Sequence, residues 1–245
     1  MSFKHLMSRN HRSASTDPRD DPAYGDPDVF YDCFYDRMPC GDWRGLARFS
    51  HLTMERPFGP DREFGSVIEV GAGDGVHLRF VRHGFERYLL TDLRAASLER
   101  CRAAWGVDPR VGYAVADAEA LGHTDASFDR VVVTCLLLHL PHPEQALAEW
   151  RRVVRPGGTI SILVPNEGAA LRFVRRLTTA RTARRLGFNG YDLMLAREHI
   201  NRSRAVDAQL RHVFRNDEVR TVGWPLSVGP MDTRLFTVYQ ITRID

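Results

Sequence analysis

Short apolar runs alternate with stretches of helical spacing through the middle of the chain. Buried strands are indicated where valine, isoleucine and leucine cluster, at residues 67–70, 88–92, 112–116, 127–134 and 159–164. The stretches between them that read as helices are 76–81, 93–104 and 143–154. Strands that alternate with helices in this way predict an α/β protein with a parallel sheet and right-handed crossovers.

The first part of the chain has a different composition. Residues 1–28 are polar and rich in Asp, Ser and Pro, which predicts a mobile tail. Residues 29–65 read as an N-terminal helical cap. Within it, Tyr31 and Tyr35 share one face of a short helix, and a second helix follows at about 42–55.

The composition fits a globular protein without a membrane span. The chain has 245 residues, 43% of them hydrophobic and 27% charged, which suits one α/β domain with additions. No apolar run approaches the ~20 residues of a membrane span, and the first ten residues lack the apolar core of a secretory signal, so we expect a cytoplasmic protein. The four cysteines form no C-x-x-C pair, and no His/Cys cluster has metal-ligand spacing. Free thiols and no metal are therefore expected.

Positive charge is concentrated in one segment. The whole chain has a formal charge of +3, whereas residues 171–215 contain eleven arginines and three acidic residues. Two interpretations are open: a solvated helix surface, or a surface that recognises an anionic acceptor such as a phosphorylated small molecule, a nucleotide-sugar or a phospholipid head group. The arginines within 172–176 fall on the opposite helical face from those within 181–185. A continuous helix here either bends near 178–179 or carries no single basic stripe.

A glycine-rich turn follows the first predicted strand. Gly71, Gly73 and Gly75 allow a sharp turn and a close approach of the backbone to a ligand. A dinucleotide fingerprint has the spacing G-x-G-x-x-G, whereas the third glycine here comes one residue early. Glu69 precedes the turn and favours a ligand with positive charge over a pyrophosphate. S-adenosylmethionine carries two such charges, a sulfonium and an ammonium group.

Two further motifs accompany the glycine turn. Asp92 ends the second predicted strand, about 20 residues past the first glycine, where a carboxylate can accept hydrogen bonds from ribose hydroxyls. Arg155-Pro156-Gly157-Gly158 forms a turn before the fifth strand. Together with the acid-x-Gly-x-Gly-x-Gly loop, these motifs resemble the class I S-adenosylmethionine-dependent methyltransferases, and within them the ubiquinone/menaquinone-biosynthesis-type branch that acts on small molecules.

The resemblance implies a cofactor and the residues that hold it. S-adenosylmethionine would be bound and S-adenosylhomocysteine released, without a metal. In the family an Asp after the third strand contacts the adenine amino group and the next backbone amide contacts the ring. That role falls to Asp117 and Ala118, with an Asx-turn as the alternative. The cofactor-binding residues implied are Glu69, Gly71, Ala72, Gly73, Gly75, Asp92, Leu93, Asp117, Ala118, Thr134 and Cys135.

The resemblance also implies the rest of the fold. It predicts a Rossmann-like, seven-stranded, mostly parallel sheet with helices on both faces and an antiparallel C-terminal hairpin, formed by 217–223 and 234–242. The methyltransferase domain would span 66–245 and include a helical lid insertion at 165–213. The helices of this insertion are expected at about 167–186 and 196–214.

In this family the acceptor lies near the segment after the fourth strand and under the lid. Two histidines there are candidate general bases, because an imidazole titrates near ~6.5: His139, which could equally be a packed core residue, and His199. An aromatic N-terminal segment often closes over cofactor and substrate, or simply packs on the domain. The substrate-binding residues expected are Tyr31, Tyr35, Leu136, His139, Arg197 and His199.

We therefore expect methyl transfer to an oxygen or nitrogen of a small molecule, in secondary or specialised metabolism. The motif N-P-P-Y, typical of enzymes that methylate nucleic-acid bases, is absent after the fourth strand, so DNA is not an expected partner. Two alternatives stay open. One is an anionic acceptor, which could be a phospholipid head group, a nucleotide-sugar or RNA. The other is a methyltransferase-fold protein whose pocket serves binding or cyclisation without methylation. No feature of the sequence indicates an oligomeric state.

Overall fold

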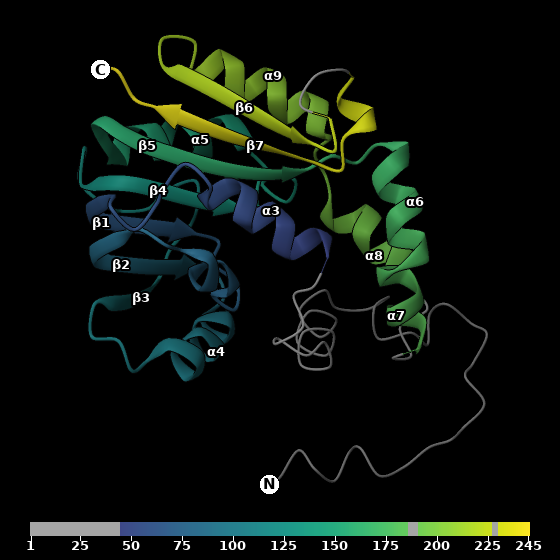
Figure 1. The fold of residues 1–245 in the computed structure, drawn as a ribbon, viewed down its shortest axis with the longest axis horizontal. Coiled ribbons are helices and arrows are strands. Elements are labelled where there is room, and N and C mark those ends of the chain that lie inside the picture. Colours follow the sequence, from purple (N-terminus) through teal and green to yellow (C-terminus); the bar gives the residue numbers. More distant parts are fainter. Residues whose placement is uncertain (1–44, 186–190, 227–229) are drawn as a thin grey trace, which may run out of the picture.

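A computed structural model describes residues 45–185, 191–226 and 230–245 (Figure 1). The tail predicted over 1–28, and Tyr31 and Tyr35 of the predicted cap, lie outside the described residues. One seven-stranded sheet has the strand order β3-β2-β1-β4-β5-β7-β6. Its strands are β1 (Glu63–Val70), β2 (Gly84–Asp92), β3 (Val111–Val115), β4 (Phe128–Thr134), β5 (Val154–Pro165), β6 (Glu218–Trp224) and β7 (Phe236–Thr242).

The strand order reverses beside β1. Strands β2 and β3 lie on one side of β1, β4 and β5 lie on the other, and all five are parallel. Strand β7 pairs antiparallel with β5, and β6 pairs antiparallel with β7. This confirms the predicted mostly parallel sheet with an antiparallel C-terminal hairpin. In such sheets a ligand binds at the carboxyl ends of the strands where the order reverses, here β1 and β4.

Helices cover both faces of the sheet (Figure 1). Alternate residues of β1 point to opposite faces: Val67 joins the core under α3, η3 and α4, whereas Ile68 joins the core under α5 and α9. None of the helices among the described residues is long and apolar enough to cross a membrane. Their bounds are α3 (Leu46–Glu55), η3 (Val76–Phe80), α4 (Ala95–Trp105), α5 (Pro143–Val153), α6 (Ala169–Leu177), α7 (Thr179–Arg185), α8 (Tyr191–Glu198), α9 (Ser203–Val213) and η4 (Met231–Thr233).

The stretch after the glycine turn is tighter than the helix expected over 76–81. Element η3 is a 3₁₀ helix, in which Leu78 N–H donates to Gly75 O and Val81 N–H donates to Leu78 O, both at 3.3 Å. Strand β2 begins at Gly84, earlier than the strand expected at 88–92, so few residues remain for the crossover. Helix α3 contacts η3 and packs on the same face of the sheet.

The described residues between β5 and β6 form four helices where two were expected. Thr178, with φ −116° and ψ −89°, divides the first expected helix into α6 and α7, which confirms the bend near 178–179. The second expected helix, over 196–214, is corrected to α9. Its residues Val206 and Leu210 are fully buried in the core against α5, so α9 belongs to the sheet packing. Helices α6, α7 and α8 stand together beyond the carboxyl end of β5 (Figure 1).

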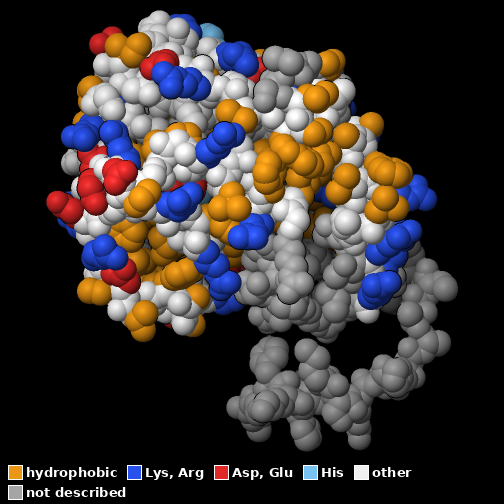
Figure 2. Space-filling view, viewed as in Figure 1, with side chains coloured by type: hydrophobic (Ala, Val, Ile, Leu, Met, Phe, Trp, Pro, Cys, Tyr) orange, Lys and Arg blue, Asp and Glu red, His pale blue; other side chains and the backbone are white. Residues whose placement is uncertain are grey.

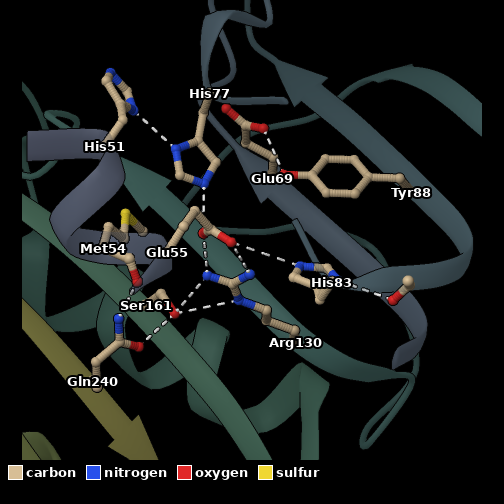
Figure 3. A network of polar contacts seen from close by, with 11 residues as sticks. His51, Met54, Glu55, Glu69, His77, His83, Tyr88, Arg130, Ser161 and Gln240 are labelled. Atoms are coloured by element: carbon tan, nitrogen blue, oxygen red, sulfur yellow. Dashed lines mark hydrogen bonds and ion pairs between the residues drawn. The ribbon is translucent and has the colours of Figure 1, made fainter. Parts of the chain in front are cut away.

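A buried ion pair joins α3 to the central strand β4 (Figure 3). The Arg130 guanidinium donates to both carboxylate oxygens of Glu55, at 2.5 Å to Oε1 and 3.0 Å to Oε2, and both side chains are buried. The guanidinium also donates to Ser161 Oγ at 3.1 Å and lies 4.1 Å from the centre of the Phe58 ring. His77 Nε2, from η3, donates to Glu55 Oε1 at 2.9 Å. The network thus ties α3, β4 and the element after the glycine turn together.

Compensation of charge makes this burial possible. Burial by itself would raise the pKa of Glu55, but the charge of Arg130 and the hydrogen bonds from His77 and Arg130 outweigh it. The pKa of Glu55 is therefore held well below its ordinary value. Removing one partner would leave an uncompensated buried charge, which typically costs ~3–5 kcal/mol.

His51 extends the network on its outer side (Figure 3). Its Nδ1 lies 2.8 Å from Nδ1 of His77, and its ring stacks on Phe80 with the ring centres 5.0 Å apart. Because His77 donates through Nε2 to Glu55, a neutral His77 accepts through Nδ1, and His51 is then the donor. Burial and the neighbouring His77 lower the pKa of His51 to about 3.

We predict that Glu55→Ala lowers the free energy of unfolding by ~3–5 kcal/mol, because Arg130 stays charged and unpaired in the core. Urea unfolding followed by circular dichroism measures the change. Asp108→Ala is the control, because it removes the partner of Arg110 from an exposed pair at 2.7 Å, where solvent screens the charges. Equal losses in the two variants would contradict a special contribution from the Glu55–Arg130 pair.

The lowered pKa of His51 predicts a pH dependence of stability. Between about 3 and the ordinary value of 6.5, the unfolded chain binds a proton at His51 that the folded chain does not bind. Stability should therefore fall as the pH is lowered through this window. His51→Phe keeps a ring against Phe80 and should make the decline shallower, as measured by urea unfolding at several pH values. His142→Gln, at an exposed position, should leave the slope unchanged. A slope identical in wild type and His51→Phe would exclude His51 as its source.

Candidate active site

The glycine turn lies between β1 and η3, at the reversal in strand order. Gly71, Gly73 and Gly75 have φ values of 66°, 54° and 68°, in the left-handed region that favours glycine. A Cβ on Gly71 would lie 2.7 Å from a methyl carbon of Leu136, and one on Gly75 would lie 3.0 Å from Cys101 Sγ. A Cβ on Gly73 would meet nothing within 4 Å among the described residues, so this part of the turn leaves room for a ligand. Leu136, from the segment after β4, therefore covers the first glycine.

Asp92 ends β2 beside this turn. Its Oδ2 accepts the Gly73 N–H at 2.9 Å and its Oδ1 accepts the Arg94 N–H at 2.9 Å. Each carboxylate oxygen keeps a further lone pair that can accept a hydroxyl. The next residue, Leu93, is 70% exposed, an unusual position for a large apolar side chain and a suitable one for contact with an aromatic base.

Asp117 and Ala118 follow β3 at the same edge of the sheet. Asp117 Oδ1 accepts the Glu119 N–H at 2.9 Å, so the Asx-turn weighed as an alternative is present, and the side chain is still exposed. Ala118 is buried, and its carbonyl accepts a hydrogen bond from Trp150 Nε1 at 3.0 Å. A structural role for these residues therefore coexists with any contact to a ligand.

Glu69 lies at the floor of the turn and is fully buried. The Tyr88 hydroxyl donates to its Oε2 at 2.8 Å, whereas its Oε1 is buried without a hydrogen-bond partner among the described residues. Burial raises the pKa of this carboxyl. A buried polar atom without a partner is uncommon and points to a group that completes it. The space beside Gly73, the exposed side chain of Leu93 and the buried carboxyl of Glu69 together fit an adenosyl cofactor with a positive charge.

Thr134 and Cys135 follow at the carboxyl end of β4. Cys135 has φ 59°, a strained value for a residue other than glycine, and its N–H donates to Leu163 O at 2.9 Å. Its side chain is exposed. Strained residues of this kind gather at functional sites because the surrounding structure holds them in place.

The two candidate bases lie in contact although they come from different elements. The rings of His139, after β4, and His199, after α8, are perpendicular with centres 4.7 Å apart. Nδ1 of His199 lies 3.1 Å from Glu167 Oε1, an ion-pair distance without the alignment of a linear hydrogen bond. Arg175 donates to the same oxygen of Glu167 at 2.6 Å. The arrangement places a carboxylate, itself held by an arginine, behind an imidazole.

The charges of this cluster fix its protonation. Burial, together with the nearby His199 and Arg175, lowers the pKa of His139 to about 4, so this ring is neutral at neutral pH. Burial would raise the pKa of Glu167, but the close contact with His199 and the charge of Arg175 outweigh it and lower the pKa. An imidazole next to an ionised carboxylate is favoured as a proton acceptor, because the carboxylate stabilises the charged ring.

Asn201 holds the two halves of the cluster together. Its N–H donates to Leu138 O at 3.1 Å, and its Nδ2 donates to Leu137 O at 3.1 Å and to Leu140 O at 2.6 Å. These bonds fasten the end of the α8 segment to the segment after β4. Arg197 lies on α8 with an exposed side chain.

Sequence reasoning did not find Glu167, Arg175 or Asn201. Glu167 could have been found from its place directly after a buried strand, at the edge where ligands bind. The other two residues had no such signal, since their partners are distant in sequence. No three His, Cys, Asp or Glu side chains among the described residues converge on a metal site.

Comparison with known proteins agrees with this geometry. Residues 68–162 match a family model described as a methyltransferase domain. The fold, the glycine turn and this match show that residues 68–162 belong to a methyltransferase domain of the class I S-adenosylmethionine-dependent type. A ubiquinone/menaquinone biosynthesis C-methyltransferase, UbiE of Acidiphilium cryptum, is 33% identical over 154 residues, which cover 59% of this chain and 60% of that protein. A phosphatidylethanolamine N-methyltransferase of Cereibacter sphaeroides is 35% identical over 104 residues, 40% of this chain and 50% of that protein.

Solved structures share the fold at low sequence identity. The carbon methyltransferase CurJ superposes with a TM-score of 0.63 and 16% identity, covering 91% of this chain and 62% of that chain. The N-methyltransferase NodS from Bradyrhizobium japonicum, in complex with S-adenosylhomocysteine, superposes with a TM-score of 0.59 and 15% identity, covering 83% and 90%. This chain spans only 60% and 50% of the two curated relatives above, so their acceptors belong to those proteins.

Asp92→Ala should weaken binding of S-adenosylmethionine and S-adenosylhomocysteine by ~10–100-fold, the equivalent of losing hydrogen bonds to a charged group. The Gly73 N–H also loses its acceptor, which loosens the turn. Calorimetric titration measures both affinities, with NADH as a ligand that should not bind. Asp108→Ala, on the exposed surface, should bind as tightly as wild type. Unchanged affinity in Asp92→Ala would remove this residue from the cofactor site.

Proposed function

We propose that this chain transfers a methyl group from S-adenosylmethionine to a small-molecule acceptor that must lose a proton, such as a hydroxyl or an activated carbon. The observation that carries the proposal is the pair His139 and His199, backed by Glu167, in the segments after β4 and β5. Leu136 contacts the glycine turn and accepts, through its carbonyl, the His139 N–H at 2.9 Å. The acceptor site and the cofactor site are therefore neighbours along one short segment.

The residues implied for the cofactor are those at the carboxyl ends of β1, β2 and β3. Asp92 would accept the ribose hydroxyls, Leu93 and Ala118 would border the adenine, and Glu69 would face the positively charged end. When bound, S-adenosylmethionine supplies an activated methyl group on a good leaving group. The main task of the chain is then to hold donor and acceptor in line, a contribution that can reach ~7–11 kcal/mol in favourable cases.

His199 is the proposed general base. Its imidazole can take the acceptor proton, and Glu167, fixed by Arg175, stabilises the imidazolium that forms. His139 stays neutral and supports the ring of His199 from the side. A carboxylate behind an imidazole favours proton uptake by the ring. This suits an acceptor that must lose a proton, whereas a neutral amine needs no base before it attacks the methyl group.

The relatives support both kinds of acceptor chemistry. Two are named for methylation of carbon, and two are named for methylation of nitrogen. We had expected an oxygen or nitrogen acceptor, and the base cluster adds carbon acids to that range. We place the reaction in small-molecule biosynthesis, in the cytoplasm.

His199→Gln should reduce kcat by ~10²–10⁴-fold on the acceptor that wild type prefers, the range typical for loss of a general base. Formation of S-adenosylhomocysteine measures turnover on a panel of phenols, β-dicarbonyl compounds and amines. Glu167→Gln should reduce kcat less and move the acidic limb of its pH profile to lower pH, because a neutral amide no longer favours the imidazolium. His142→Gln, at an exposed position, is the matched control.

Two results would overturn the base assignment. Turnover on phenols or β-dicarbonyls that neither His199→Gln nor His139→Gln alters would exclude both histidines. Turnover on amines alone would exclude an acceptor that must lose a proton. Binding of S-adenosylmethionine without any turnover on the panel would favour the non-methylating alternative.

A further inference from the structure

Helix α6 has two faces with different partners. Its inner face packs on the domain: Leu171 is buried, Val174 is half-buried, and Arg175 pairs with Glu167. Its outer face carries Phe173, which is 64% exposed, and Leu177, which is 42% exposed. Because these two residues are four apart in a helix, their side chains lie next to each other. The outer face is thus apolar where an ordinary surface helix is polar.

Arginines surround this apolar pair. Arg172 and Arg176 are exposed on α6, and Arg181 and Arg185 are exposed on α7, which follows directly. The sequence contains no aspartate or glutamate between Glu167 and Asp192. Figure 2 shows hydrophobic side chains beside Lys and Arg side chains at the edge where Figure 1 shows α6 and α7. The surface therefore combines large apolar groups with positive charge, and the sequence of α6 and α7 contains no acidic residue.

We propose that this α6–α7 surface, defined by Arg172, Phe173, Arg176, Leu177, Arg181 and Arg185, binds the surface of an anionic membrane. Helices that lie in a membrane interface place large apolar side chains among the acyl chains and arginines among the phosphates. The long arginine side chains can reach the head groups while their methylene stems stay near the apolar region. A nucleic acid would satisfy the arginines but would leave Leu177 without a suitable partner.

The proposal goes beyond methyl transfer and does not depend on it. The surface lies on the opposite side of α6 from Arg175 and Glu167, so the variants that test it leave the base cluster intact. If the proposed function also holds, the same helix carries the membrane contact outside and the acceptor site inside. A lipophilic acceptor could then be taken up from the membrane.

Co-sedimentation of the full chain with vesicles tests the proposal. Vesicles of phosphatidylcholine mixed with phosphatidylserine should bind the protein, and phosphatidylcholine alone should not. The double variant Phe173→Gln/Leu177→Gln should bind ~10-fold or more weakly, because it has lost the apolar insertion. Arg176→Gln/Arg181→Gln should also weaken binding, and added salt should weaken binding of wild type.

Two controls test whether a loss of vesicle binding is specific to the α6–α7 surface. Val107 is 97% exposed in the turn after α4, and Val107→Gln should bind the mixed vesicles as wild type does. All variants should keep their affinity for S-adenosylmethionine, which shows that they are folded. No binding to the mixed vesicles would overturn the proposal. So would binding that Phe173→Gln/Leu177→Gln leaves unchanged, or a preference for RNA over vesicles at the same salt concentration.

Discussion

The structure depends on the ion pair between Glu55 and Arg130. Arg130 lies on β4, in the middle of the sheet, where a charge without a partner would not be tolerated. The partner does not come from a neighbouring strand but from the last residue of α3, 75 residues earlier in the chain. The ion pair therefore ties helix α3 directly to the central strand of the sheet. Through His77, the same carboxylate also holds the element that follows the glycine turn.

The candidate site follows from the reversal in strand order. Loops after β1, β2 and β3 form the half that fits an adenosyl cofactor, and segments after β4 and β5 form the half with the histidines. The two halves meet where Leu136 covers Gly71. Asn201 fixes the half with the histidines, because its three hydrogen bonds hold the helical segment against the end of β4. The geometry of the candidate site therefore depends on where the strands end and on the hydrogen bonds of Asn201.

Sequence reasoning found what local pattern encodes. Buried strands and the glycine turn have signals within a few residues, whereas the hairpin was implied by the family resemblance, and all are present in the structure. The 3₁₀ form of η3 was missed because helical periodicity does not show how little chain remains before β2. The place of α9 in the core was missed because its apolar face fits a lid equally well. Glu55–Arg130 and Glu167–His199 were missed because long-range pairing of charges leaves no trace in a single sequence.

The distance of Glu55 from Arg130 along the chain also bears on how the domain is made. During synthesis α3 leaves the ribosome well before β4, and its carboxylate has no guanidinium to meet until that strand appears. The pair can therefore form only after both α3 and β4 have been made, as a contact between residues distant in sequence. The segment matched by the family model, 68–162, contains Arg130 without Glu55. A fragment that begins after α3 would therefore leave the Arg130 guanidinium without its carboxylate in the core.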